Sequence, residues 1–174
     1  MNRIRPLDYV LAALMTAAGA LLMVLNIAGE ENLAHPPSTT SWVILPVFLL
    51  VTIPILWRRR NILAVVGVTA AALAVHVVAF GWLTRCGAAL PLSFALAYAV
   101  ARFAGGARNQ LIGLAGVVVV QLLTLVQDSS IGGLPGGLEI ALPGAALFYG
   151  IGFWVQNRVT KKHTVTPAAE RATV

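Results

Sequence analysis

Trp57-Arg58-Arg59-Arg60-Asn61 is the stretch that decides the fold. It places three consecutive arginines in a chain of which only 10% of the residues are charged, and long apolar runs lie on both sides of it. An arginine at the centre of a bilayer costs roughly 2.5–3.5 kcal/mol on insertion scales, so the cluster must lie at a membrane surface. Basic residues concentrate on the cytoplasmic side of membrane proteins. Arg58, Arg59 and Arg60 therefore predict a cytoplasmic topology anchor between two membrane-spanning helices.

The composition is that of an integral membrane protein. The 174 residues are 59% hydrophobic, and the mean hydropathy is +0.86, whereas a soluble domain is about 45–50% apolar and about 25% charged. A net charge of +6 in a soluble protein would indicate a nucleic-acid partner. Here the basic residues stand between apolar runs and set the topology, so we expect the lipid bilayer as partner and no nucleic acid.

The apolar runs predict an all-α, polytopic bundle of six transmembrane helices in residues 1–157. The predicted helices are about 7–28, 41–57, 62–83, 88–103, 110–127 and 138–156. The first run is longer than the apolar core of a signal peptide, about 7–15 residues, so we interpret it as a retained helix. Pro54 is expected to kink or loosen the second helix near its end. We expect residues 158–174 to be a short, basic, disordered cytoplasmic tail.

The basic residues predict that both termini are cytoplasmic, in the plasma membrane. With six helices, the cytoplasmic side holds every basic residue except Arg85, which is alone on the outside. The cytoplasmic set is Arg3, Arg5, Arg58, Arg59, Arg60, Arg102, Arg108, Arg158, Lys161, Lys162 and Arg171. Asp8 lies in the first turn of the first helix, where we expect its carboxylate to complement the helix dipole; a proton-relay role is the alternative.

Few polar residues lie within the predicted helices, and three of them are candidates for a sensing or polar-cluster site. His76, two turns from the outer end of the third helix, is either a proton sensor or ligand contact, or a neutral histidine bonded to a backbone or hydroxyl group in the bundle. Glu139 is either its partner from the sixth helix or a carboxylate at that helix's N-terminus, where it would be the second residue. Gln121 is the third candidate.

No residue pattern indicates catalysis, a metal or a cofactor. His35, His76 and His163 have no second ligand three or four residues away, and no Gly-x-Ser-x-Gly elbow or phosphate-binding loop is present. The single cysteine, Cys86, excludes an intramolecular disulfide. We therefore expect no enzyme activity.

Three segments resemble the N-terminal transmembrane sensor domain of actinobacterial two-component sensor histidine kinases. They are Trp-Arg-Arg-Arg-Asn-Ile-Leu-Ala-Val (57–65), Leu-Pro-Leu-Ser-Phe-Ala-Leu-Ala-Tyr-Ala-Val-Ala (90–101) and Gly-Ile-Gly-Phe-Trp-Val-Gln-Asn-Arg (150–158). Ile62 stands where that family usually has a proline, and the closing Gly-Arg motif is degraded. The resemblance covers roughly residues 1–160 and implies a sensing module, here without the kinase portion.

The expected function is therefore a non-catalytic, orphan sensor-like or accessory module of a membrane signalling system. Small residues at helical spacing offer faces for another membrane protein or a second copy of the chain. These faces are Ala13, Ala17 and Ala20; Gly67 and Ala71; and Ala146 and Gly150. The alternative is a small transporter or permease subunit, in which His76, Gln121 and Glu139 would line one cavity.

Overall fold

The computed structural model describes residues 6–29, 33–130 and 133–171, with the side chains of the last helix described up to Thr160. The helices are α1 (Pro6–Ala28), α2 (Ile44–Thr52), the 3₁₀ helix η1 (Ile53–Trp57), α3 (Ile62–Phe80), α4 (Cys86–Phe103), α5 (Ala107–Leu125) and α6 (Gly133–Arg171). Apart from one isolated β-bridge between Leu83 and Asp128, these ranges contain no β-structure. The described chain is all-helical, as predicted.

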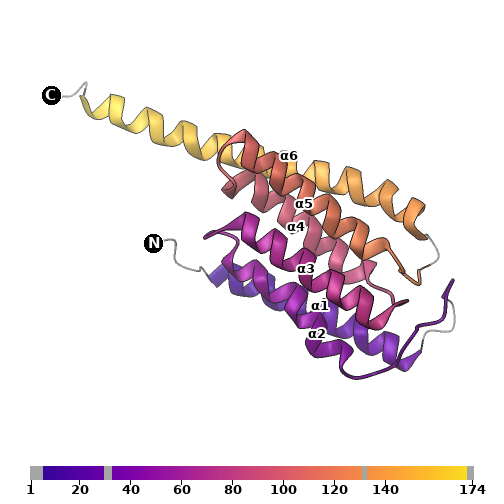
Figure 1. The fold of residues 1–174 in the computed structure, drawn as a ribbon. Coiled ribbons are helices and arrows are strands. Elements are labelled where there is room, and N and C mark those ends of the chain that lie inside the picture. The colour runs from indigo at the N-terminus through magenta and orange to yellow at the C-terminus, as the bar shows by residue number, and fades with distance from the viewer. Residues whose placement is uncertain (1–5, 30–32, 131–132, 172–174) are drawn as a thin grey trace.

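Successive helices run antiparallel along a single bundle, as Figure 1 shows. One group consists of α1, α2 and α3, and the other of α4, α5 and α6; the two meet where α1 and α3 pack on α4 and where α3 packs on α5. The start of α1 and the end of α6 lie at the same end of the bundle. We call this end the basic end, because the described arginines of 58–60, 102 and 108 lie there; the other is the opposite end.

Helix α4 is the centre of the packing. It contacts α1, α2, α3, α5 and α6, and Leu92, Leu96 and Val100 along it are completely buried. Most other helices turn large apolar side chains outward, such as Leu14 of α1 and Val78 of α3. An apolar core beneath an apolar exterior is the pattern of a helix bundle in lipid rather than in water.

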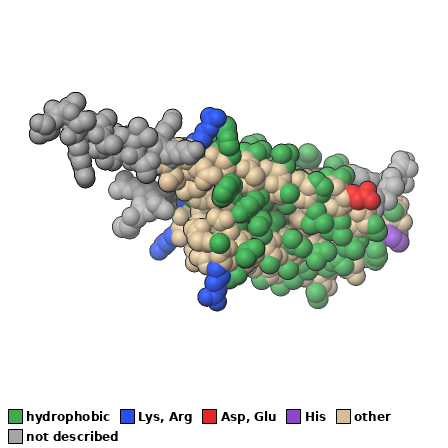
Figure 2. Space-filling view, turned by 90° about the horizontal axis from the view of Figure 1, so that it is seen from above, with side chains coloured by type: hydrophobic (Ala, Val, Ile, Leu, Met, Phe, Trp, Pro, Cys, Tyr) green, Lys and Arg blue, Asp and Glu red, His purple; other side chains and the backbone are tan. Residues whose placement is uncertain are grey.

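Five helices are long and apolar enough to span a membrane, so the chain is a helical multi-pass membrane protein. They are Pro6–Ala28, Ile62–Phe80, Cys86–Phe103, Ala107–Leu125 and Leu134–Thr160 within α6. The remaining apolar helix, Ile44–Trp57, is shorter. Figure 2 shows hydrophobic side chains over the middle of the molecule and blue basic side chains gathered at one end of it.

The second helix begins later than predicted. A helix from residue 41 was expected, but residues 42 and 43 form a turn and α2 begins at Ile44. The predicted loosening at Pro54 takes the form of η1, which continues from α2 to Trp57. Proline has no backbone N–H, so it cannot donate the hydrogen bond that would extend the α-helix through this point.

The sixth helix is longer than predicted at both ends. It begins at Gly133 rather than 138, and it continues to Arg171 through the segment predicted as a disordered tail. Pro135 is compatible with a first helical turn, and Gly137 permits close contact, since a Cβ there would lie 2.3 Å from Leu125 Cδ2. Between Trp154 and Pro167 no glycine or proline occurs, so nothing in the sequence interrupts the helical hydrogen bonds of residues 155–166.

The third helix ends at Phe80 instead of 83. Gly81 follows with a φ of +63°, a left-handed conformation that glycine adopts without steric cost. Its N–H still donates to Val77 O at 2.9 Å. The early end frees residues 81–85 to form the connection on which the candidate site is built.

Candidate functional site

A buried polar cluster closes the opposite end of the bundle. Its members come from the end of α1, from α3, from the α3–α4 connection and from the α5–α6 connection. We define the cluster as Asn26, His76, Thr84, Arg85 and Asp128, all of which are buried. Only His76 was predicted as a site residue.

Arg85 is the centre of this cluster and is 0% exposed. Its Nε–H donates to His76 Nδ1 at 3.2 Å, and Nη1 donates to the backbone oxygen of Gln127 at 3.0 Å. Nη2 donates to the backbone oxygen of Gly81. One guanidinium therefore joins α3, its C-terminal cap and the α5–α6 connection, using the planar fork that distinguishes arginine from lysine.

Asp128 is the acidic member of the cluster, but it does not form a direct ion pair with the guanidinium. Its Oδ2 accepts from the backbone N–H groups of Arg85 (2.6 Å) and Cys86 (2.9 Å), and its Oδ1 accepts from Ser130 N (2.9 Å). The carboxylate thus caps the N-terminus of α4 from another part of the chain, where a negative charge also complements the helix dipole.

Burial lowers the pKa of Arg85 to about 10, and the nearby charge of Asp128 opposes that shift. The guanidinium therefore stays protonated at neutral pH. Among the described residues no carboxylate lies within salt-bridge distance of it. The cluster consequently holds a buried cation that neutral acceptors solvate, an arrangement whose desolvation cost must be offset by well-placed hydrogen bonds.

Asn26 joins the end of α1 to the α3–α4 connection through two hydrogen bonds. Its Nδ2 donates to Thr84 O and its Oδ1 accepts from Thr84 N, both at 3.0 Å. Further backbone hydrogen bonds extend the closure: Ala34 N donates to Ser129 O at 3.0 Å and Ser38 N donates to Trp82 O at 2.9 Å. Segments from all three connections at this end are therefore tied together.

His76 is held as a neutral imidazole. Because Nδ1 accepts from Arg85, the ring proton is assigned to Nε2 from the hydrogen-bond network. Nε2 is buried and makes no hydrogen bond of normal geometry with a described residue, although the backbone of Ile44 lies near the ring. The ring packs edge-on against Phe48, with centroids 5.2 Å apart, and against Phe80 at 4.8 Å. The side-chain partner of this histidine is the Arg85 guanidinium, whereas the bonded alternative predicted from the sequence had a backbone or hydroxyl partner.

The other two candidates lie apart from the cluster. Gln121 is buried between helices of the second group, and its Nε2 donates to Ser93 Oγ (3.2 Å) and Ala141 O (2.8 Å). Glu139 is exposed, and no hydrogen bond or ion pair links it to another described residue. It is the seventh residue of α6 rather than the second, so the predicted contact with the helix N-terminus is wrong.

The predicted topology anchor contains an ion-pair site at the basic end. Asp8 is completely buried, and Arg58 Nη2 lies 2.8 Å from its Oδ1. Arg59 Nε lies 2.8 Å from Oδ2 of the same carboxylate, and the Arg59 guanidinium lies over the Phe103 ring at 5.1 Å. Asp8 was expected to complement its own helix dipole, with a proton-relay role as the alternative; in the structure it also binds two arginines of another segment.

Sequence reasoning missed four members of the cluster, Asn26, Thr84, Arg85 and Asp128, and it missed the ion pairs of Asp8 at the basic end. Arg85 did carry a signal, since it is the single basic residue on the side predicted to be outside. Asp8 and Asp128 are two of only six acidic residues in the chain. Their partners lie 50 and 43 positions away along the sequence, and no periodicity connects positions so far apart.

The chemistry that the cluster offers is hydrogen bonding and charge. No serine or cysteine side chain is bonded to His76 within the described ranges, and no group of three metal-ligating side chains occurs in that part of the chain. Comparison with protein families, with curated proteins and with solved structures gives no match.

Proposed function

We propose that this protein is a non-catalytic, six-span plasma-membrane module of a signalling system, either sensor-like or accessory to another membrane protein. The single observation that carries the proposal is how the polar side chains of the helices are used. Several of them are hydrogen-bonded from one helix to another. A transporter would instead gather them around a path for its substrate.

Three ties illustrate the pattern. Thr16 and Thr52 join α1 to α2 at 2.9 Å, Gln121 joins α5 to α4 and α6, and Tyr149 of α6 donates to Gln110 of α5 at 2.6 Å. Such interhelical hydrogen bonds contribute about 0.6 kcal/mol each on average in a membrane. These hydrogen bonds hold the helices in fixed relative positions. A signal would then pass to a partner through the ends and outer faces of the bundle.

The alternative of a small transporter or permease subunit requires His76, Gln121 and Glu139 to line one cavity. No hydrogen bond or ring contact joins any two of these residues. Glu139 is exposed, whereas the other two are completely buried. The geometry therefore favours the signalling module.

The buried polar cluster fits a sensing role at the side predicted to be extracellular. The Arg85 guanidinium binds the backbone oxygens of Gly81 and Gln127, so a conformational change in the cluster would move α3, α4 and α5 together. The helices that leave it reach the basic end, where a cytoplasmic partner would read the change. This role accords with the resemblance to sensor domains.

The small-residue faces support a protein partner. A Cβ added at Gly150 would meet nothing within 4 Å, and Ala146, Ala13 and Ala17 are exposed. The bundle does not use these faces for its own packing, so they remain available for the close backbone approach that small residues permit.

Affinity purification from the membranes of the source cells, with quantitative mass spectrometry, tests the proposal. We expect one membrane protein to be recovered with the tagged wild-type chain in near-equal amount. Gly150→Ile or Ala17→Ile should reduce that recovery at least several-fold, while Val78→Leu, a change at another exposed site, should not. Recovery of no protein partner, or equal recovery with all variants, would contradict the proposal.

A further inference from the structure

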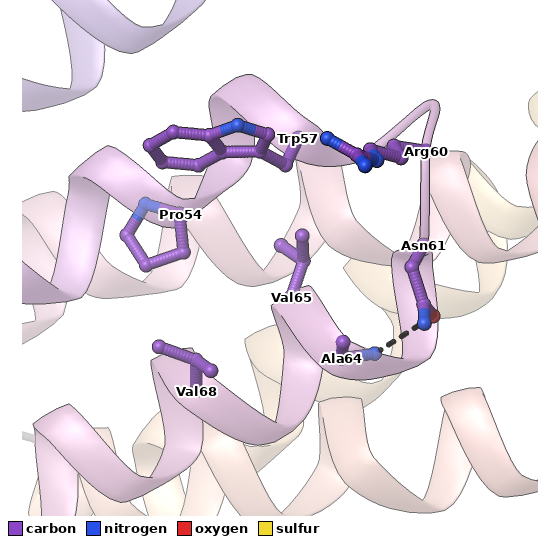
Figure 3. A pocket seen from close by; sticks show the side chains of 7 residues that line it. All are labelled: Pro54, Trp57, Arg60, Asn61, Ala64, Val65 and Val68. Carbon is purple, nitrogen blue, oxygen red and sulfur yellow. Dashed lines mark hydrogen bonds between the residues drawn. The ribbon is translucent and has the colours of Figure 1, made fainter. Parts of the chain in front are cut away.

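An apolar groove lies at the basic end, between η1 and the first turns of α3. Its volume is about 320 Å³, and its lining is almost entirely apolar. The lining residues are Pro54, Trp57, Arg60, Asn61, Ala64, Val65 and Val68, which Figure 3 shows. From Asn61 to Val68 it follows about 10 Å of the α3 axis, at 1.5 Å per residue.

The local sequence explains why this space stays unfilled. Pro54 gives η1 its 3₁₀ geometry, which is narrower than an α-helix, and Ala64 faces it with only a methyl group. Asn61 Oδ1 accepts from Ala64 N at 3.1 Å and fixes the start of α3. Trp57 and Val68 are 44% and 55% exposed, so the groove opens on the outer surface of the bundle.

One arginine of the topology anchor differs from its two neighbours. Arg58 and Arg59 share the Asp8 carboxylate. The Arg60 side chain is exposed, and its guanidinium pairs with none of the described residues. In Figure 3 the Arg60 side chain extends over the mouth of the groove towards Trp57. An unpaired cation therefore stands at the polar end of an apolar channel.

We infer that this groove binds one anionic phospholipid, with its phosphate at Arg60 and an acyl chain along Pro54, Val65 and Val68. The channel has room for about ten groups the size of a water molecule, and basic pockets beside membrane helices bind phosphate headgroups. The exposed Trp57 indole lies where tryptophans meet the headgroup level. The inference requires only that the basic end lies at a membrane surface, and it is independent of the signalling role.

Native mass spectrometry of the full-length protein, delipidated and then supplied with defined lipid, tests this site. The probes are phosphatidylglycerol and, as the uncharged comparison, phosphatidylcholine of the same chain length. We expect wild type to retain one phosphatidylglycerol with about a five-fold preference, the factor for one basic side chain at an anionic surface. Arg60→Gln should reduce the preference to about one, and Arg60→Lys should keep most of it.

Two further variants separate a built site from general surface charge. Arg108→Gln removes an exposed arginine in the first turn of α5, at the same end of the bundle, and should leave the preference unchanged. Ala64→Phe fills the groove and should reduce binding of both lipids, with an unchanged helical circular-dichroism spectrum as the folding control. Equal losses in Arg60→Gln and Arg108→Gln, or no loss in Arg60→Gln, would overturn the inference. Displacement by soluble glycerol phosphate would also overturn it, by assigning the site to a free phosphate.

Discussion

Arg85 and Asp8 show two ways in which a single residue holds this bundle together. Asp8 is a buried anion that two arginines neutralise from another segment. Arg85 is a buried cation that two backbone oxygens and one imidazole nitrogen solvate. Both residues lie at helix ends, where a charge is closest to the membrane surface. In each case the geometry of the partners matters more than the charge itself.

Arg85→Lys is the change that isolates this geometry. Lysine keeps the buried charge, but its compact ammonium cannot reach three acceptors that are arranged for a planar fork. We expect the substitution to lower the free energy of unfolding by about 2–4 kcal/mol, the cost of losing one or two charged hydrogen bonds. Detergent-induced unfolding followed by circular dichroism would measure it. The matched control is Arg102→Lys, because Arg102 makes one side-chain hydrogen bond, to Tyr98 at 2.8 Å.

The pH profile supplies a second readout for the same variant. Burial lowers the pKa of Arg85 in the folded chain to about 10, below its ordinary value. The unfolded chain therefore binds more protons only above about pH 9, so wild-type stability should gain nothing from this group between about pH 6 and pH 9. A lysine there would lose its proton at lower pH, so the stability of Arg85→Lys should rise with pH. A variant as stable as wild type, with a flat profile, would refute this account of Arg85.

At the scale of elements, close helix packing depends on glycines of α5 and α6. A Cβ at Gly144 would lie 2.6 Å from the Phe94 ring, and one at Gly152 would lie 2.6 Å from the backbone oxygen of Tyr98. At Gly113, a Cβ would lie 2.8 Å from Val100. All three contacts are with α4. Helices α5 and α6 can therefore pack closely on α4 because they carry glycine, which has no side chain, at these positions.

Gly152→Ala and Gly150→Ala form a matched pair on one helix. Gly152→Ala places a methyl group against the backbone of Tyr98, which the helical hydrogen bonds of α4 hold in place. We expect this variant to destabilise the bundle by about 1–3 kcal/mol. The second meets open space and should stabilise α6 by about 0.5–1 kcal/mol, because alanine loses less backbone entropy than glycine. Thermal unfolding of the two proteins in the same detergent measures the difference. Equal effects would show that α4 and α6 are not in close contact at Gly152.

The number and approximate positions of the helices could be predicted from the sequence, because each apolar run is bounded by polar residues or glycines. The face of each helix that points into the bundle could not be predicted. Gly67, Ala71, Ala146 and Gly150 have the right spacing for helix packing but lie outside the bundle. A membrane helix is apolar all round, so its pattern does not distinguish a face toward protein from one toward lipid.

The candidate site was predictable only in part for a related reason. A lone histidine within an apolar run is visible in the sequence, and His76 is indeed buried within the bundle. Its partner Arg85 lies in a connection, and Asp128 lies in another connection 43 positions later. Their meeting depends on how the helices close at that end, which requires the three-dimensional structure.

At the scale of the whole molecule, two contacts determine how often the chain crosses the bundle. The Asp8–Arg58 ion pair places residue 58 at the end where α1 begins. The Asn26–Thr84 hydrogen bonds place residue 84 at the end where α1 finishes. Helices α2 and η1 therefore return along the bundle, although together they span only about 23 Å by their rises per residue, less than the roughly 30 Å of hydrocarbon. The short second helix is therefore the segment that distinguishes six spans from five.

Alkaline phosphatase fusions, active only outside the cytoplasm, test that proposal at the second helix. We expect activity for fusions after Gly29 and Ser130, and none for fusions after Asn61, Gly106 and Thr160, because the basic residues of each inner segment retain it in the cytoplasm. Cytoplasmic fluorescent-protein fusions at the same positions should give the reciprocal pattern, which controls for expression. The decisive pair is Gly29 and Asn61. Equal activity at the two would mean that α2 and η1 lie along the surface, leaving five spans and placing the two termini on opposite sides of the membrane.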